Sequence, residues 1–82
     1  MKTILFLCTG NSCRSQMAEA IVNARFPEWK ASSAGTKPAG YVDELAKEVL
    51  SEIGISHSGT SKHLNDLPTK DFDIVVTVCD SA

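Results

Sequence analysis

A cysteine and an arginine flank a short polar turn near the start of the chain, in the stretch Cys8-Thr-Gly-Asn-Ser-Cys-Arg14-Ser15. Backbone N–H groups in such a turn, followed at once by the N-terminus of a helix, form a concave site that favours a negatively charged ligand. The planar guanidinium of Arg14 matches two oxygens of a tetrahedral oxyanion. We therefore predict an oxyanion site above Cys8, lined by Thr9, Gly10, Asn11, Ser12, Cys13 and Arg14.

The same loop supplies a nucleophile. Positive surroundings favour the thiolate form of Cys8, and a thiolate attacks electrophilic centres readily. Ser15 can donate a hydrogen bond to the sulfur. Gly10 allows a tight backbone, and Asn11 tolerates left-handed geometry while its side chain ties the loop together. A cysteine and an arginine at this spacing occur often by chance, so this pair alone is weak evidence for an oxyanion site. The strand expected before the loop and the helix expected after it strengthen the prediction.

The apolar pattern predicts strands and helices that alternate along the chain. We expect strands at residues 3–7, 30–33 and 73–79, helices at 15–26 and 43–53, and a polar loop over 56–70. This order predicts a single α/β domain over residues 1–82, with a parallel sheet and flanking helices in a three-layer α/β/α arrangement. Ligands bind beyond the carboxyl ends of such strands, where Cys8 and Cys79 both fall.

Each expected helix has an apolar face at three- and four-residue spacing. On the first helix this face comprises Met17, Ala20, Ile21 and Ala24. On the second it comprises Leu45, Val49, Leu50 and Ile53. We expect both faces to be buried.

Composition excludes several classes of function. The 82 residues carry a formal net charge of −2 without a basic stripe, so we expect neither a nucleic-acid nor a membrane partner. The apolar run at residues 4–7 is too short for a signal or spanning segment, and three cysteines fit catalytic or redox thiols in a cytoplasmic protein. His57 and His63 lack partners at metal-ligand spacing, so we expect solvated loop histidines and no metal.

The loop and the residues after it resemble a known family. Cys8 to Ser15, followed by Gln16-Met-Ala-Glu19, is similar to the phosphate-binding loop and first helix of low-molecular-weight protein tyrosine phosphatases. The closer resemblance is to the thioredoxin-coupled arsenate reductases of this fold. Three further segments support it in the family's order, namely 32–35, 60–62 and 75–80.

Two details favour the reductase branch. Phosphatases usually carry Ser-Pro after the loop arginine, whereas Ser15-Gln16 is similar to the reductases, and Cys79 stands where the reductases carry a second thiol. The resemblance implies that Cys8 attacks arsenate and that Cys79 attacks the adduct. Arsenite then leaves as a Cys8–Cys79 disulfide forms, in a step of arsenic detoxification that uses no cofactor. Thioredoxin or another thiol reductant would restore the thiols. For Cys13 we expect a packing role.

The resemblance also bears on a cation. In many reductases of this branch, the residues that match Asn11, Glu19 and Ser33 support a bound potassium ion. Lys62 stands where a potassium-binding member carries an aspartate. We therefore expect its ammonium group to replace the cation in supporting the loop, and we expect no dependence on potassium.

The sequence ends at Ala82, whereas the family continues with a third cysteine, a further strand, an Asp-Pro acid loop and closing helices. We expect this C-terminally incomplete chain to bind the oxyanion, to run the first thiol steps slowly, and to dimerise through exposed sheet surface. Two alternatives stay open. One is a tyrosine phosphatase that hydrolyses aryl phosphate, and the other is an inactive fragment that binds an oxyanion.

Overall fold

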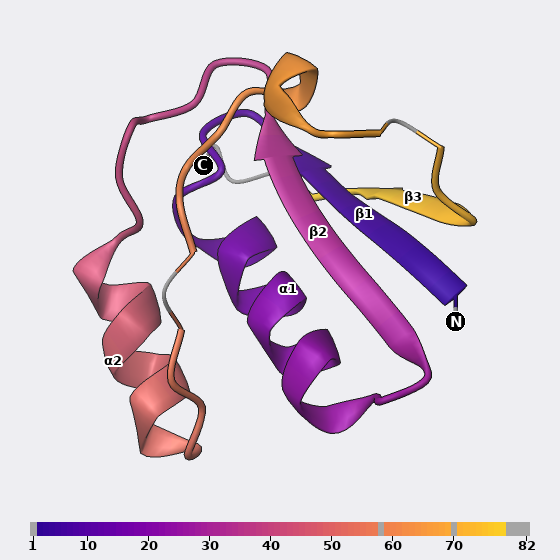
Figure 1. The fold of residues 1–82 in the computed structure, drawn as a ribbon. Helices are drawn as coiled ribbons and strands as arrows, with labels where there is room; N and C mark the ends of the chain where they lie inside the picture. Colours follow the sequence, from indigo (N-terminus) through magenta and orange to yellow (C-terminus); the bar gives the residue numbers. More distant parts are fainter. Residues whose placement is uncertain (1, 58, 70, 79–82) are drawn as a thin grey trace.

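A computed structural model describes residues 2–57, 59–69 and 71–78. Its elements are β1 (Lys2–Cys8), α1 (Arg14–Arg25), β2 (Trp29–Gly35), α2 (Glu44–Glu52), the 3₁₀ turn η1 (Leu64–Asp66) and β3 (Ile74–Thr77). Both strand pairings are parallel, and β1 lies between β2 and β3 (Figure 1). The prediction of an α/β fold with a parallel sheet is confirmed.

The strand register brings the carboxyl ends of the strands to one edge of the sheet. Cys8 pairs with Gly35 on β2, and Leu7 pairs with Thr77 on β3. Strand β2 is longer than the predicted 30–33, because its pairing with β1 continues from Trp29 through Gly35. The part of the predicted third strand that contains Cys79 lies outside the described residues.

Helix α1 buries a more polar face than we predicted. Its buried residues are Ser15, Gln16 and Ala20, whereas Ala24 is exposed. The first turn of α1 faces the loop after β1 rather than an apolar core, so the polar side chains there are buried against polar partners. The apolar part of the face comprises Met17, Ala20 and Ile21, which pack against Leu50 of α2 and Ile55.

Helix α2 begins after Asp43, whose carboxylate accepts a hydrogen bond from the Leu45 backbone N–H at 2.9 Å. The predicted apolar face is wrong for Leu45 and Ile53, which are 61% and 46% exposed. It is confirmed for Leu50, which is fully buried, and Ala46 is the other buried residue of the helix. Because α2 packs on α1 rather than on the sheet, only a narrow stripe of it is covered (Figure 1).

The layers differ from the three-layer arrangement in one respect. Helix α1 packs on β1 and β2, and α2 lies beside α1, but the described residues provide no helical layer on the second face of the sheet. Ile74 and Val75 on β3 are 44% and 53% exposed. Apolar sheet surface therefore stays open in the described part of the chain.

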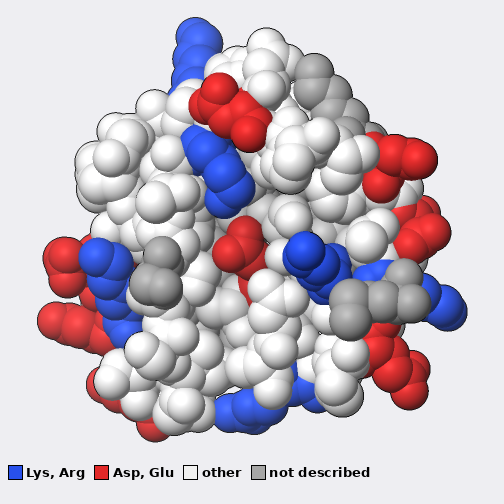
Figure 2. Space-filling model, in the orientation of Figure 1, with Lys and Arg blue, Asp and Glu red and all other residues white. Residues whose placement is uncertain are grey.

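The surface carries mixed charge. On the face shown in Figure 2, Lys and Arg side chains are interspersed with Asp and Glu side chains. Neither α1 nor α2 has the length and apolar character that crossing a bilayer requires, and residues 2–57, 59–69 and 71–78 contain no other candidate span.

Candidate active site

The loop after β1 has all of its carbonyl oxygens engaged by hydrogen-bond donors. Each backbone carbonyl from residue 8 to residue 13 accepts a bond, from Thr36 N, Lys37 N, Ala39 N, Gln16 Nε2, Asp43 N and Met17 N in that order, at 2.7–3.1 Å. The negative ends of these peptide dipoles are therefore directed to donors around the loop, so they oppose a bound anion less. Helix α1 begins directly after the loop, and its N-terminus adds positive potential.

Most of these donors come from the segment after β2, residues 36–43. From the sequence we expected no role for this segment in the site. Its backbone N–H groups, however, bind the loop from Cys8 to Ser12. Backbone donors leave no signature in side-chain type or spacing, so this role could not be found from the sequence.

The Cys8 sulfur is buried, with 7% of the residue exposed, and lies close to two groups that can donate hydrogen bonds. The Asn11 backbone N–H donates to Sγ at 2.9 Å, and Ser15 Oγ lies 2.9 Å from Sγ. Ser15 Oγ accepts a bond from Asn11 Nδ2 at 3.0 Å, so its own hydrogen is available to the sulfur. Hydrogen bonds of this kind favour the thiolate.

Asn11 organises the loop. It has φ of 49°, the only positive value for a non-glycine residue in the described part of the chain, and it is fully buried. Its Oδ1 accepts bonds from Lys62 N at 2.9 Å and from Gln16 Nε2 at 3.0 Å, which fixes the orientation of the amide. The amide nitrogen consequently faces Ser15.

Asn11 adopts the left-handed conformation, as we predicted that it could. Gly10 has no positive φ, and a side chain there would meet nothing closer than 3.5 Å, so the structure does not require a glycine at this position. Gly35, at the end of β2, does need to lack a side chain. A Cβ atom there would collide with the Thr9 carbonyl oxygen.

The residues expected to support the loop lie together. Ser33 Oγ donates to Glu19 Oε1 at 2.8 Å, and Lys62 Nζ lies 3.8 Å from the same oxygen. The Lys62 side chain is 24% exposed and that of Glu19 is 14% exposed. Because the Lys62 ammonium group already balances the Glu19 carboxylate, the site formed by Glu19, Ser33 and Asn11 does not fit a potassium ion. Among the described residues, no three His, Cys, Asp or Glu side chains gather as metal ligands.

The other predicted site residues surround the loop. Cys13 is half-buried at the N-cap of α1, Arg14 begins the helix and is exposed, and Ser12 is half-buried. Cys8 lines a cavity of about 320 Å³ at the carboxyl ends of β1 and β3, together with Leu7, Thr9, Thr36, Thr77 and Val78. Cys79 lies outside the described residues.

The two histidines are less solvated than we expected. His57 is half-buried, and its Nε2 lies 2.7 Å from Gln16 Oε1. His63 is also half-buried, and its Nδ1 accepts a bond from the Asn65 backbone N–H in capping η1. Gln16 is fully buried beside the loop, yet we had used it only as a mark of resemblance. Spacing along the chain gave no sign that His57 and Gln16 meet, because 41 residues separate them.

The chain is similar to proteins of one known family. A sequence model of the low molecular weight phosphotyrosine protein phosphatase family matches residues 3–82. An arsenate reductase from Staphylococcus aureus (strain bovine RF122 / ET3-1) is 45% identical over 83 residues, which cover 99% of this chain and 63% of that protein.

Two solved structures are also similar. The arsenate reductase from Archaeoglobus fulgidus is 42% identical with a TM-score of 0.83, and the match covers 96% of this chain and 64% of that one. An arsenate reductase described in its phosphate-binding state is 32% identical with a TM-score of 0.84, and the match covers 100% of this chain and 63% of that one. The chain thus spans less than two thirds of the length of these relatives.

Proposed function

Because the chain belongs to the low molecular weight phosphotyrosine protein phosphatase family, we propose that it reduces arsenate to arsenite, a reaction that detoxifies arsenic. The observation that carries the proposal is the environment of Cys8. Its sulfur, held by Asn11 and Ser15, lies at the base of a loop whose carbonyl oxygens are all engaged elsewhere. The similarity to arsenate reductases at 42–45% identity supports arsenate as the oxyanion.

The reaction has two sulfur steps. The Cys8 thiolate attacks arsenic(V), so that a sulfur–arsenic bond forms and one arsenate oxygen leaves as water. Cys79 then attacks the Cys8 sulfur, and the electron pair of the sulfur–arsenic bond passes to arsenic. The two thiols lose two electrons together, arsenic(V) becomes arsenic(III), and arsenite departs. Thr77 and Val78 line the same cavity as Cys8, and Val78 directly precedes Cys79 in the sequence, which supports this pairing.

The residues around Cys8 bind arsenate and stabilise the thiolate. The loop from Thr9 to Cys13 binds arsenate through its backbone, and Arg14 binds two arsenate oxygens. Ser15 stabilises the Cys8 thiolate before it attacks arsenic. Lys62 supports Asn11 through its backbone N–H, and its ammonium group lies beside Glu19, which accepts a bond from Ser33. The ammonium group takes the role that a cation would otherwise fill.

The disulfide needs an external reductant after each turnover. Thioredoxin or another dithiol supplies two electrons and regenerates both thiols. Residues 1–82 act as one domain in this scheme.

A second candidate function is hydrolysis of aryl phosphate. The family description favours it, and phosphate has the same tetrahedral geometry and charge as arsenate. This reaction needs Cys8 and the loop but no second thiol. In a third alternative the chain only binds an oxyanion; Cys8→Ser would then leave phosphate binding intact, and arsenate would consume no thiol.

The Cys79→Ser variant separates these candidates. Wild type and variant are compared for arsenite formed with a dithiol reductant and for hydrolysis of an aryl phosphate. If the protein is an arsenate reductase, Cys79→Ser should form no arsenite, while Cys8 should still form a bond with arsenic when arsenate is added. Aryl phosphate hydrolysis that survives the substitution, without arsenite from either protein, would favour the phosphatase and reject our proposal.

A further inference from the structure

We infer that Gln16 is a positioning residue for the oxyanion loop and that His57 acts on the loop through Gln16. The inference rests on the proposed function of the loop as an oxyanion site. It concerns the amide and the ring that meet behind the loop.

Gln16 joins the loop to a distant segment. Its Nε2 lies 3.1 Å from Asn11 O, 3.0 Å from Asn11 Oδ1 and 2.9 Å from Thr60 O, so its two hydrogens serve three acceptors. The side chain is fully buried. Asn11 in turn donates its backbone N–H to the Cys8 sulfur. Gln16 is therefore one residue removed from the nucleophile and holds both oxygens of the residue that adopts the left-handed conformation.

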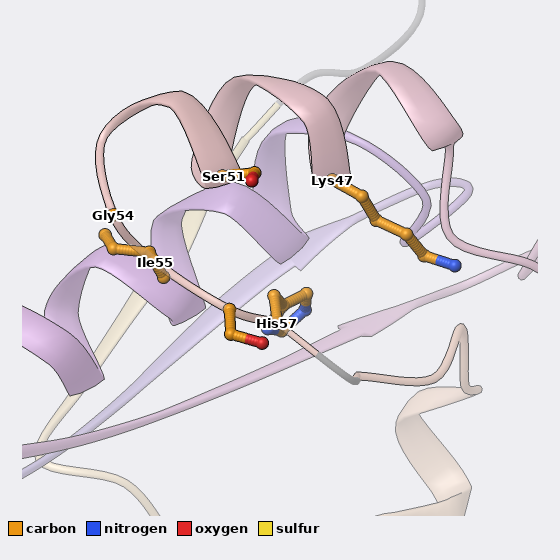
Figure 3. Close-up of a pocket in the computed structure, with 6 residues that line it drawn as sticks. Lys47, Ser51, Gly54, Ile55 and His57 are labelled. Atoms are coloured by element: carbon orange, nitrogen blue, oxygen red, sulfur yellow. The ribbon is translucent and has the colours of Figure 1, made fainter.

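His57 fixes the other end of the amide. Because Gln16 Nε2 faces three oxygens, Oε1 is the atom that meets His57, and an oxygen can only accept. His57 therefore donates from Nε2 at 2.7 Å. Figure 3 shows His57 on the segment after α2, with Lys47 and Ser51 on the helix itself. These three residues are among those that line a cavity of about 390 Å³. His57 thus supports Gln16 from the side away from the loop.

The contact between Gln16 and His57 leaves no room for a side chain at position 59. A Cβ atom on Gly59 would lie 2.5 Å from Gln16 Oε1 and 2.5 Å from His57 Nε2. The segment around Gly59 must therefore pass close against the contact. In the same segment, the Ser61 hydroxyl donates a hydrogen bond to Gly10 O at 2.9 Å.

The physical consequence concerns an unpaired oxygen. Without the Gln16 amide, Asn11 O would lose its donor inside a fully buried residue, and such a group is costly to leave unsatisfied. Thr60 O would keep its bond from Lys62 Nζ at 3.1 Å. The loop would relax toward solvent or toward another conformation of Asn11. Its affinity for an oxyanion and the reactivity of Cys8 should both fall.

The test measures Cys8 directly, without arsenate reduction. The variant Gln16→Met keeps the length of the side chain and removes its hydrogen bonds. We measure the rate at which iodoacetamide alkylates Cys8, identified by peptide mass, and the phosphate concentration that protects it. We expect Gln16→Met to slow alkylation and to raise the protecting phosphate concentration, each by about tenfold.

The variant Asn23→Leu is the matched control. Asn23 is another amide on α1, and it makes two hydrogen bonds with the Ala31 backbone, at 3.1 and 2.8 Å, away from the loop. It should lower the urea midpoint of unfolding and leave both Cys8 measurements unchanged. Equal losses of phosphate protection in the two variants would overturn the inference, since they would show only a general effect of stability.

His57→Ala tests whether His57 acts on the loop through Gln16. As a single variant it can be measured even if Gln16→Met does not fold. Alone it should weaken phosphate protection less than Gln16→Met does, and combined with Gln16→Met it should add nothing. Additive effects, or wild-type protection in either single variant, would overturn the inference. Because phosphate protection needs no arsenate chemistry, an absence of arsenite formation would reject the proposed function and leave this result standing.

Discussion

The direction of the hydrogen bonds around Cys8 is set by residues behind it. Lys62 and Gln16 bind Asn11 Oδ1, so the Asn11 amide nitrogen faces Ser15, and the Ser15 hydroxyl can face the sulfur. Hydrogen bonds to a thiolate favour the reactive form. The nucleophile is thus prepared by a chain of polar groups rather than by one neighbour.

Removing the hydroxyl should slow the thiol. Ser15→Ala takes away the hydroxyl that lies 2.9 Å from the sulfur, and we expect Cys8 to be alkylated about tenfold more slowly at neutral pH. Peptide mass after timed quenching measures the rate for each cysteine separately. Ser12→Ala serves as the control, since it keeps the Ser15 hydroxyl. A Ser15→Ala rate equal to that of wild type would show that the hydroxyl does not stabilise the thiolate.

Lys62 should make the loop indifferent to potassium. The wild-type midpoint of urea unfolding is expected to be the same in KCl and NaCl at equal ionic strength. Lys62→Asp replaces the ammonium group beside Glu19 with a second carboxylate. In NaCl this variant should have a free energy of unfolding about 1 kcal/mol lower than wild type, and in KCl the difference should be smaller. Lys62→Met offers no ligand and should not respond. A wild-type protein stabilised by potassium over sodium would contradict this account.

At the scale of elements, the sequence predicted type and order well and buried faces less well. The strands and helices appear where the apolar pattern placed them, because periodicity follows from which side of an element is covered. Leu45 and Ile53 are exposed because α2 packs only on α1, a fact of tertiary arrangement that spacing alone does not contain. Likewise, the N–H groups of residues 36–43 bind the loop without any sequence mark.

The amino ends of β1 and β3 are joined by a carboxylate. The Thr3 backbone N–H donates to Asp73 Oδ2 at 2.7 Å, and the Thr3 hydroxyl donates to the same atom at 3.2 Å. The backbone hydrogen bond, and then the hydroxyl, hold the pKa of Asp73 below its usual range. A lowered pKa in the folded state means that the ionised carboxylate stabilises the fold above the unfolded pKa, and that this stability is lost as the pH falls through the folded value.

Asp73→Asn should therefore destabilise the protein at neutral pH. Its deficit in urea midpoint should shrink as the pH falls below about 4, the unfolded value for an aspartate, and should vanish below the folded pKa. Asp71→Asn is the control, because Asp71 contacts Thr69 through its backbone N–H. A deficit that stays constant from pH 7 to pH 2 would show that the charge of Asp73 is not the cause.

At the scale of the whole molecule, one sheet surface remains open. Ile74 and Val75 are largely exposed on β3, and in the described residues this strand pairs only with β1. Exposed β-branched edge strands favour pairing with another chain. We expect the 82-residue chain to associate as its concentration rises in sedimentation velocity, and we expect Val75→Lys to remain monomeric.

Leu45→Lys is the matched control for this association, since Leu45 is a comparably exposed apolar residue on α2. It should associate as wild type does. A monomeric wild type, or equal behaviour of the two variants, would show that β3 is not the contact.

The loop could be predicted from sequence because its chemistry is local. Cys8, Asn11, Arg14 and Ser15 lie within eight consecutive residues, so their types and order are visible along the chain. The supports that reach the loop from residues 36–43 and from His57 depend on the fold. Their contribution could be seen only in three dimensions.

The central claim is that Cys8 and Cys79 together reduce arsenate, and a single turnover tests it most directly. Fully reduced protein is mixed with arsenate, or with phosphate as the control, then quenched by alkylation and mapped by peptide mass. We predict a Cys8–Cys79 disulfide that appears with arsenate and not with phosphate, together with one arsenite per disulfide. Thiols that all remain reduced, or a disulfide between Cys8 and Cys13 instead, would contradict the account.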